Sequence, residues 1–348
     1  MTYQIKIQSK VTRIEILENW LKKQFSLSSI EIVPIKNDAS FRQYYRCTIN
    51  GSSYVVMDAP PDKENIFQFL KITNIFGQTN ILVPKVFAHD LEQGFMVLSD
   101  FGDTWLLTIL KNSTQDEISA WYQRAMDSLS EIQKIPTQGL DIPLFNANHI
   151  RLELSYFSEW FLSKLLKLSL SQVQLQIINQ TESFLIQSAV QEPQVVIHRD
   201  YHSRNLMVLP DETLGIIDYQ DAMIGPLSYD VASLLKDCYI VWPKVQIESW
   251  LHYFYDKIDL EYSFAEFKKS FELMGLQRHL KVLGVFSRLN LRDNKPHYLN
   301  DIPRIIQYVV SVTSLYPELS KLHALFTQEI IPAFTQYQAL RQESVCEQ

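Results

Sequence analysis

The sequence predicts an α+β protein with two lobes, a small β-rich N-terminal lobe and a larger, mainly helical C-terminal lobe. Up to about residue 100, short runs rich in β-branched and aromatic residues alternate with polar turns, as in small β-sheets. Beyond that point apolar residues recur every three or four positions, which is the spacing of amphipathic helices. No Pro/Gly-rich or low-complexity stretch separates the two regions. We therefore expect lobes at 1–100 and 101–348, joined by a tight hinge near residues 99–103.

The N-terminal region begins with a helix and continues as strands. Residues 11–25 have the charge and apolar spacing of an amphipathic helix. Two strand pairs follow, one around the turn Asn50-Gly51-Ser52 and the other around the polar segment 90–94. The strands are predicted at 44–50, 54–58, 83–87 and 95–98. Small β structure is thus expected to dominate this lobe.

The C-terminal region is helical with one β interruption. Helical spacing is clearest in two sets of apolar residues, Leu154, Phe157, Phe161 and Leu165, and Leu273, Leu276, Leu280 and Leu283. Between them, two short apolar strands at 195–197 and 214–217 each lead into polar residues. Side chains that follow neighbouring strands are well placed to share a site.

Composition and charge limit the classes of partner. The 348 residues are 46% hydrophobic and 20% charged, as in ordinary globular proteins. A formal net charge of -7 argues against nucleic acid as the main partner, because binding to phosphates needs a basic face. The N-terminus lacks the pattern of a secretory signal, and no run of about 18 apolar residues exists, so we expect a cytoplasmic protein without a membrane partner. No obligate protein partner is indicated. The scattered Cys47, Cys238 and Cys346 fit reduced thiols.

The strongest chemical signal is the order of three polar residues after the two internal strands. Asp200 follows the first strand in the run His198 to Asn205, Asn205 lies five residues further on, and Asp218 follows the second strand. This order is typical of kinases with a protein-kinase-like fold. Phosphoryl transfer needs a hydroxyl held in line with the γ-phosphorus and a metal that neutralises the phosphate oxygens. Asp200 is therefore predicted as the catalytic base, and Asn205 and Asp218 as magnesium ligands.

Two competing interpretations of these motifs are weaker. His198 and His202 resemble a zinc pair, but the glutamate of a His-Glu-x-x-His helix is missing. Asp100-Phe101-Gly102 spells the magnesium motif of protein kinases, yet it precedes the catalytic loop, whereas the metal-binding carboxylate should follow it. Asp218 follows the catalytic loop, as the kinase pattern requires, whereas Asp100 precedes it.

The ATP site is predicted from order and has two departures from the kinase pattern. Backbone groups of Ser99, Asp100 and Phe101 are expected to bind adenine at the hinge. The glycine-rich phosphate loop is replaced by residues 37–42, and the strand 54–58 lacks the phosphate-binding lysine. We expect Ser40, Phe41 and Arg42 to form the phosphate loop, since a hydroxyl, backbone amides and a guanidinium can bind phosphates. The missing lysine leaves a non-catalytic nucleotide-binding pseudokinase as an alternative.

Several segments resemble one group within the aminoglycoside phosphotransferase-like kinases. Residues 38–42, 57–61, 217–222 and 274–284 are similar to the bacterial anomeric kinases that act on N-acetylmuramate and N-acetylglucosamine in cell-wall recycling. In that family Met-Asp-Ala-Pro-Pro is usual where other kinases have the lysine strand. The resemblance covers nearly the whole chain and implies phosphorylation of the C1 hydroxyl of an amino sugar, with ATP and Mg²⁺ as cofactors.

An amino-sugar site needs polar donors and an aromatic wall. Gln277, Lys281, Gly284 and Arg288 lie at helical spacing and would form one stripe, with glycine opening space; the alternative is a solvated helix face. Glu153 and Trp160 share a second stripe with Phe157, which is better explained by core packing. Arg204 and Asp221 flank the predicted centre and would orient the substrate or its phosphate.

Two other kinds of kinase fit the sequence less well. A protein kinase needs an activation loop, but Pro226 lies only eight positions after Asp218. A kinase for aminoglycosides or another small-molecule hydroxyl is the second alternative, and a polycationic substrate would require an acidic pocket. Lys281 and Arg288 favour a neutral or anionic sugar instead.

Overall fold

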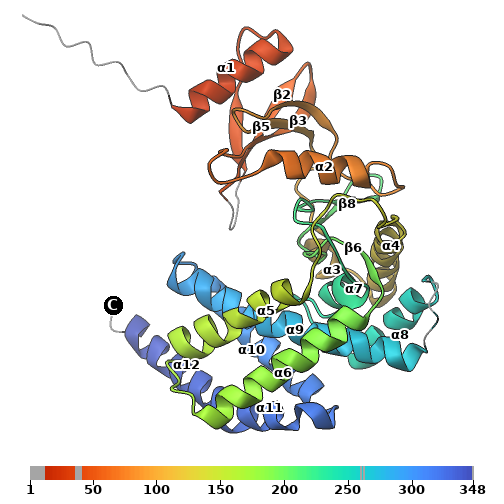
Figure 1. Ribbon diagram of the computed structural model, residues 1–348. Coiled ribbons are helices and arrows are strands. Elements are labelled where there is room, and N and C mark those ends of the chain that lie inside the picture. Colours follow the sequence, from red (N-terminus) through yellow and green to blue (C-terminus); the bar gives the residue numbers. More distant parts are fainter. Residues whose placement is uncertain (1–11, 36–40, 259–260, 262, 347–348) are drawn as a thin grey trace, which may run out of the picture. The chain divides into compact units, whose positions relative to one another are not determined.

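The computed structural model describes residues 12–35, 41–258, 261 and 263–346 of the chain. Their contacts divide them into two units (Figure 1). The first unit comprises the residues up to Thr104 and the segment Met207–Gln220, and the second comprises Trp105–Leu206 and the residues from Asp221 onward. The segment Met207–Gln220 thus belongs to the first unit, although the boundary predicted after residue 100 assigns it to the second lobe.

The first unit is built on a five-stranded antiparallel sheet with the order β1-β2-β3-β5-β4. Its strands are β1 (Ile32–Ile35), β2 (Gln43–Ile49), β3 (Ser52–Asp58), β4 (Val86–Asp90) and β5 (Phe95–Ser99). Ile49 pairs with Ser52, so the hairpin turn consists of Asn50 and Gly51, both with positive φ (51° and 82°). This is the pattern of a tight two-residue turn, and Ser52, predicted in the turn, belongs to β3. The strand predicted from residue 83 begins at Val86, after Pro84, which has no N–H to donate.

Two helices accompany this sheet (Figure 1). Helix α1 (Arg13–Phe25) was predicted, and it begins with a capping box in which Thr12 and Glu15 exchange hydrogen bonds. Its Leu17 and Leu21 are fully buried in a core with Tyr45 and Val97 of the sheet. Helix α2 (Ile66–Phe76) was not predicted. Its apolar residues include many Phe and Ile, which also favour strands, and the Asn65 side chain that caps its N-terminus was the missed signal.

The second unit is mainly helical, as predicted. Its α-helices are α3 (Leu106–Leu110), α4 (Gln115–Gln133), α5 (Ala147–Tyr156), α6 (Gln172–Gln191), α7 (Ser228–Leu235), α8 (Lys244–Tyr255), α9 (Phe264–Leu291), α10 (Ile302–Thr313), α11 (Ser320–Leu325) and α12 (Ile331–Cys346). Shorter π or 3₁₀ segments are η1 (Phe157–Leu165), η2 (Pro296–Asp301), η3 (Pro317–Leu319) and η4 (Phe326–Ile330). Helix α9 packs against α5, η1, α7 and α10 (Figure 1). No helix in the described part of the chain is long and apolar enough to cross a membrane.

Gly284 lets α9 approach the junction of α5 and η1. A Cβ atom at Gly284 would lie 2.2 Å from the backbone C and O atoms of Tyr156. The glycine therefore serves backbone packing. The prediction that it opens space for a sugar is wrong.

Short strands position the predicted catalytic residues. In the second unit, β6 (Gln194–Ile197) pairs antiparallel with β9 (Met223–Pro226), and the loop with Asp200 follows β6 directly. The strands β7 (Leu206–Val208) and β8 (Leu214–Ile216) pair with each other. Gly215 of β8 also bridges to Leu82, and Asp218 follows this strand in the first unit. The two internal strands predicted from the sequence are thus present.

Candidate active site

The catalytic loop after β6 has its backbone held from two sides. The Asp230 carboxylate on α7 accepts hydrogen bonds from the N–H groups of His198 (2.6 Å) and Arg199 (2.9 Å). Arg278 on α9 donates from Nη1 to the carbonyl oxygen of Arg199 (2.8 Å) and from Nη2 to Ser233 Oγ (2.5 Å). Arg199 has a φ of 77°, a strained value for a residue with a side chain. Asp230 and Arg278 thus hold the backbone of Arg199, the residue directly before Asp200.

Hydrogen bonds further along the loop fix its shape. The carbonyl oxygen of Asp200 accepts from His202 N (3.1 Å) and from Asn205 Nδ2 (2.9 Å), so the Asn205 amide is oriented by the loop itself. Asp237, just after α7, accepts from Ser203 N (3.1 Å) and Ser203 Oγ (2.5 Å). Two of the three predicted central residues, Asp200 and Asn205, are therefore brought together within the second unit.

Cationic side chains keep Asp200 ionised. Burial opposes its ionisation, but the charges of Lys281, His202, Arg278 and Arg199 outweigh burial and lower its pKa to about 2. At neutral pH the carboxylate is thus a hydrogen-bond acceptor and a weak base. Of the lysine and arginine residues near Asp200, only Lys281 was predicted at the site, since helical spacing along α9 does not show that Arg278 faces the loop that carries Asp200.

Glu153 on α5 is the centre of a buried polar cluster. Its carboxylate accepts from Arg199 Nη2 (2.8 Å), Lys281 Nζ (2.7 Å) and Gln277 Nε2 (3.1 Å). Burial opposes ionisation of Glu153, but Lys281 and Arg199 hold its pKa below the usual value. The structure thus joins Glu153, Gln277 and Lys281, which were predicted on two separate stripes. Gln277 is only 1% exposed, so the alternative of a solvated helix face is wrong for this residue.

The other predicted substrate residues have different surroundings. Trp160 lies on the π-helical η1, where the Lys164 ammonium group is 3.6 Å from its ring centroid. The guanidinium of Arg288 lies over Tyr156 (4.9 Å), and that of Arg204 lies over Tyr239 (4.0 Å). Asp221 is exposed. The change from α-helical to π-helical geometry at Phe157 alters the offset between Glu153 and Trp160, so their α-helical stripe does not continue.

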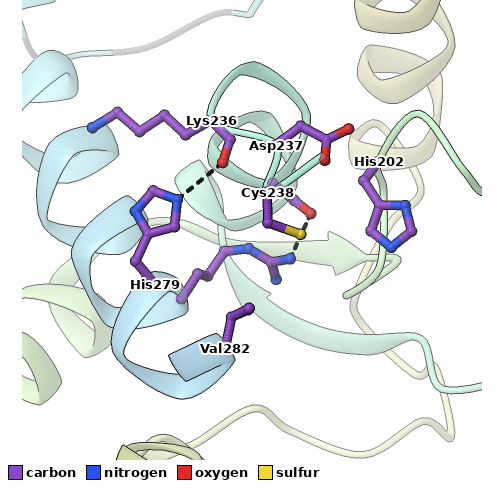
Figure 2. Close-up of a pocket in the computed structure, with 8 residues that line it drawn as sticks. His202, Lys236, Asp237, Cys238, His279 and Val282 are labelled. Carbon is purple, nitrogen blue, oxygen red and sulfur yellow. Dashed lines mark hydrogen bonds between the residues drawn. The ribbon is translucent and has the colours of Figure 1, made fainter. Parts of the chain in front are cut away.

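A small cavity lies beside the predicted catalytic loop (Figure 2). Figure 2 shows His202 of the loop on one side, Lys236, Asp237 and Cys238 after α7, and His279 and Val282 of α9 on the other. The pKa of His279 is lowered to about 3, mainly by burial and further by the nearby charges of Lys236 and Arg278. The cavity volume of about 20 Å³ suits a single water molecule and excludes a sugar or nucleotide.

Asp218 lies in the first unit, where it meets a cationic side chain. Arg42 Nη2 contacts Glu64 Oε2 at 2.8 Å, and Arg42 Nη1 lies 3.8 Å from Asp218 Oδ1. Gln220 Nε2 donates to Asp218 Oδ1 (2.8 Å). Asp218 has a φ of 62°, in the left-handed region, and its side chain is 46% exposed. Arg42 was predicted to bind phosphate; Glu64, 22 residues further along the chain, was not predicted in any role.

The rest of the predicted phosphate loop is only partly described. Phe41 is 63% exposed, and the Lys63 ammonium group lies 4.9 Å from its ring centroid. Ser40 lies outside the described residues.

The predicted adenine segment 99–101 is tied into the first unit. Ser99 N donates to the carbonyl oxygen of Lys85 (2.9 Å), so this N–H already has an acceptor. The Asp100 carboxylate accepts from Arg46 Nε (2.6 Å) and Ser53 Oγ (2.5 Å), which agrees with its exclusion as a metal ligand. The ring of Phe101 packs against Gly215, where a Cβ atom would lie 2.5 Å from it. Nearby, a groove of about 520 Å³ is lined by Glu31, Val33, Pro34, Ile35, Arg46, Cys47, Thr48 and Asp103.

The available donors suit magnesium better than zinc. Among the described residues, no cluster of three or more His, Cys, Asp or Glu side chains could hold a metal alone. Mg²⁺ needs fewer protein ligands, because it is commonly bound by one or two oxygen ligands together with substrate phosphates and water. The partly exposed Asp218 carboxylate and the oriented Asn205 amide provide hard oxygen donors of this kind.

Comparison with protein families identifies the type of enzyme. Residues 31–261 match the phosphotransferase enzyme family. The N-acetylmuramate/N-acetylglucosamine kinase of Pseudomonas aeruginosa is 38% identical over 300 residues, covering 85% of this chain and 87% of that protein. The protein of the same name from Neisseria meningitidis is 37% identical over 319 residues, covering 90% of this chain and 94% of that protein.

Solved structures support the fold. A Plasmodium vivax ethanolamine kinase has a TM-score of 0.63 at 14% identity, covering 88% of this chain and 92% of its own. The ADP-bound aminoglycoside phosphotransferase APH(2'')-Ib has a TM-score of 0.61 at 16% identity, with coverage of 85% and 98%. At these identities the likeness shows the fold alone. The predicted protein-kinase-like fold is thereby confirmed.

Proposed function

Because the chain belongs to the phosphotransferase enzyme family, and within it to the N-acetylmuramate/N-acetylglucosamine kinases, we propose that it transfers the γ-phosphoryl group of ATP to the C1 hydroxyl of one or both of these sugars. The product is a sugar 1-phosphate, and the reaction would serve the reuse of cell-wall sugars. The observation that carries the proposal beyond the family is the environment of Asp200. The Asp200 carboxylate is ionised and lies on a loop whose backbone is held by hydrogen bonds. The charge of Lys281 lowers the pKa of Asp200, and its Nζ also donates to the buried Glu153.

In this proposal Asp200 orients the attacking hydroxyl and accepts its proton. A carboxylate with a pKa of about 2 is a weak base, which suits phosphoryl transfer because the loose transition state needs little proton removal at the start. An anomeric hydroxyl is also more acidic than an ordinary alcohol. The main task of Asp200 is therefore to hold the hydroxyl in line, and its fixed backbone supports that task.

We assign Asn205 and Asp218 to magnesium. Bound Mg²⁺ neutralises charge on the phosphate oxygens. The hydrogen bond from Asn205 Nδ2 to the Asp200 carbonyl orients the amide, and the left-handed backbone at Asp218 sets the direction of its carboxylate. These two features support the assignment because each gives its side chain a defined orientation.

ATP is assigned to groups of the first unit. Ser40, Phe41 and Arg42 are proposed to bind the phosphates. Adenine is proposed to bind to backbone groups of Ser99, Asp100 and Phe101, except the Ser99 N–H, which donates to the Lys85 carbonyl oxygen. The groove lined by β1, β2 and Asp103 has a volume in the usual range for small-molecule sites. The family membership supports ATP as the phosphoryl donor.

The sugar is assigned to the face of the second unit that carries the Glu153 cluster. Glu153, Gln277 and Lys281 are proposed to recognise its polar groups, with Trp160, Arg204, Asp221 and Arg288 as further candidates. Arg199, Arg278 and Lys281 face the carboxylates of Glu153, Asp200 and Asp230 in this region, and burial raises the pKa of Asp230 to about 7, so the region has no excess of negative charge. This balance favours a neutral or anionic sugar over a polycationic aminoglycoside.

The position of phosphorylation can be tested directly. The protein is incubated with ATP and magnesium and with N-acetylmuramate, N-acetylglucosamine or the 1-O-methyl glycoside of either sugar. Phosphorus NMR is expected to show a sugar 1-phosphate from the free sugars only. Equal turnover of the methyl glycosides would overturn the C1 assignment, and turnover of an aminoglycoside alone would overturn the sugar assignment.

A variant of the proposed base separates catalysis from binding. Asp200→Asn is expected to abolish turnover while calorimetry still detects binding of ADP and magnesium. A wild-type protein that binds ADP without any turnover of the four sugars would favour the pseudokinase alternative.

A further inference from the structure

The first unit contains an ion pair between Arg42 and Glu64 that joins two separate elements. Arg42 directly precedes β2, and Glu64 directly precedes Asn65, the N-cap of α2. Their side chains meet at 2.8 Å and are only 12% and 15% exposed. A guanidinium buried to this extent requires a paired carboxylate, because desolvation of a lone charge is costly. Glu64 therefore fixes where Arg42 lies.

The strand that carries the phosphate-binding lysine in protein kinases has no cation here. Near the end of β3, Met57 is fully buried, and its partner across the hairpin is Tyr44. Arg42 lies two residues before Tyr44, so its backbone is close to the end of β3 that contains Met57. The acidic neighbour Asp58 is already paired with Arg13 (2.5 Å). A cation close to this end of β3 is thus supplied by Arg42, which directly precedes β2.

The same guanidinium also faces the proposed metal ligand. Arg42 Nη1 lies 3.8 Å from Asp218 Oδ1, whereas its Nη2 is 2.8 Å from Glu64 Oε2. The tighter contact is with Glu64, which holds one edge of the planar group and thereby directs the other edge toward Asp218. In kinases a lysine paired with a glutamate of a neighbouring helix contacts the ATP phosphates close to the metal. Arg42 and Glu64 have the same chemical relationship, with a different strand supplying the cation.

We propose that Glu64 is a positioning residue, which holds the Arg42 guanidinium to bind the phosphates of the nucleotide, and that this pair replaces the missing lysine pair. The proposal rests on the proposed function, because it needs a nucleotide as ligand. It extends that function by assigning a role to Glu64 and by explaining how β3 can lack a lysine. A guanidinium can bind two phosphate oxygens at once, so the pair supplies geometry as well as charge.

The test is a double-mutant cycle measured on nucleotide affinity. Dissociation constants for ADP with magnesium are determined by calorimetry for the wild type, Arg42→Met, Glu64→Gln and the double variant. Loss of charge-assisted hydrogen bonds to phosphate is expected to weaken binding by about tenfold or more in Arg42→Met and by a smaller factor in Glu64→Gln. If Glu64 acts through Arg42, Glu64→Gln adds little in the Arg42→Met background.

A matched control and a second readout exclude a merely structural role. Arg13→Gln removes a different ion pair of the same unit and is expected to lower the melting temperature without changing ADP affinity. Arg42→Lys keeps the charge and is expected to recover part of the affinity lost in Arg42→Met. In turnover assays the KM for ATP should rise in Glu64→Gln while the KM for the sugar stays unchanged.

Several results would overturn the proposal. One is an unchanged ADP affinity in Glu64→Gln. Another is a double variant whose loss of ADP affinity equals the product of the two single losses. A third is an equal rise in the KM values for ATP and for the sugar in Glu64→Gln. Failure of the proposed function is distinguishable, because it would appear as absent sugar phosphorylation by the wild type, whereas the cycle is measured on ADP binding without a sugar.

Discussion

Arg278 donates a hydrogen bond from Nη1 to the backbone carbonyl oxygen of Arg199 at 2.8 Å. Arg199 carries the strained φ of 77° directly before Asp200, so this contact stabilises an otherwise unfavourable backbone at the catalytic loop. Arg278 is 8% exposed, and its guanidinium also lies 4.5 Å from the ring centroid of Tyr229. Its position is thus set from several sides.

Replacing Arg278 is expected to reduce turnover more than substrate binding. Arg278→Met leaves the Arg199 carbonyl without this donor, at a cost of about 1–3 kcal/mol, and lets the backbone relax so that Asp200 moves. We expect kcat to fall by about tenfold or more while the KM for ATP changes little. Steady-state kinetics measure both parameters.

Arg304→Met is a matched control for Arg278→Met. Arg304 also donates to a backbone carbonyl, that of Cys238 (2.5 Å), but it does not contact the residues 198–200 in any hydrogen bond that the structure records. The control is expected to lose stability and to keep its kcat. Equal losses of kcat in the two variants would contradict a specific role for Arg278.

Gly284→Ala is expected to destabilise the second unit. The added methyl group would lie 2.2 Å from the Tyr156 backbone, and backbone cannot move aside as a side chain can. Overpacking of this kind typically costs about 1–3 kcal/mol, which exceeds the helix propensity gained from alanine. Urea unfolding with and without the substitution measures the difference.

Gly275→Ala provides the comparison on the same helix. Its added Cβ would meet the flexible Lys236 side chain, with Cδ at 2.8 Å, so adjustment is easier than at Gly284. We expect a small change in stability. If Gly284→Ala were as mild as Gly275→Ala, the close approach of α9 to Tyr156 would not be required for folding.

Local patterns in the sequence were sufficient for most of the elements, although β1 and α2 were missed, and for the order of the predicted catalytic residues. The hairpin at Asn50-Gly51 follows from residues that tolerate positive φ, and Asp200 and Asn205 share one short loop. Fold class could be predicted because periodicity changes once, near residue 100.

Partners distant in the chain could not be predicted in the same way. The contact of Glu64 with Arg42, and that of Arg278 with Arg199, form only when the chain folds. Helical spacing shows which residues share one face of a helix, but it does not show which residues that face contacts. The π-helical turn at Phe157 lies beside the close approach of Gly284 to the Tyr156 backbone, and helix propensities describe neither feature. The role of Gly284 was misjudged for that reason.

Glu192 is expected to make stability depend on pH. Burial raises its pKa to about 7, although hydrogen bonds from Ser228 N and Oγ (both 2.9 Å) favour the ionised form. In the unfolded chain a glutamate titrates near 4.3, so between these values the folded protein binds more protons than the unfolded chain. The stabilisation is complete below the unfolded pKa and is lost as pH rises through about 7.

Glu192→Gln should remove this component. From pH 5 to pH 8 the free energy of unfolding of the wild type is expected to fall relative to that of the variant by on the order of 3 kcal/mol. Urea unfolding at both pH values measures it, with Glu131→Gln as a control at a surface ion pair. Parallel pH dependence in wild type and Glu192→Gln would contradict a raised pKa.

The contact between Glu153 and Lys281 offers the sharpest test of the buried cluster. Glu153→Gln leaves the charges of Arg199 and Lys281 without their common carboxylate, and Lys281→Met removes one of two cations that hold Glu153 ionised. Breaking a buried pair from one side costs about 3–5 kcal/mol, whereas removing both partners leaves less uncompensated charge. The destabilisation of the double variant, measured by urea unfolding, should therefore be smaller than the sum of the single effects by about 1 kcal/mol or more.

If the cluster also recognises the sugar, Glu153→Gln raises the KM for the sugar without changing the KM for ATP. Additive stabilities would show that the two charges do not interact in the folded protein, and equal changes in both KM values would remove Glu153 from the sugar site.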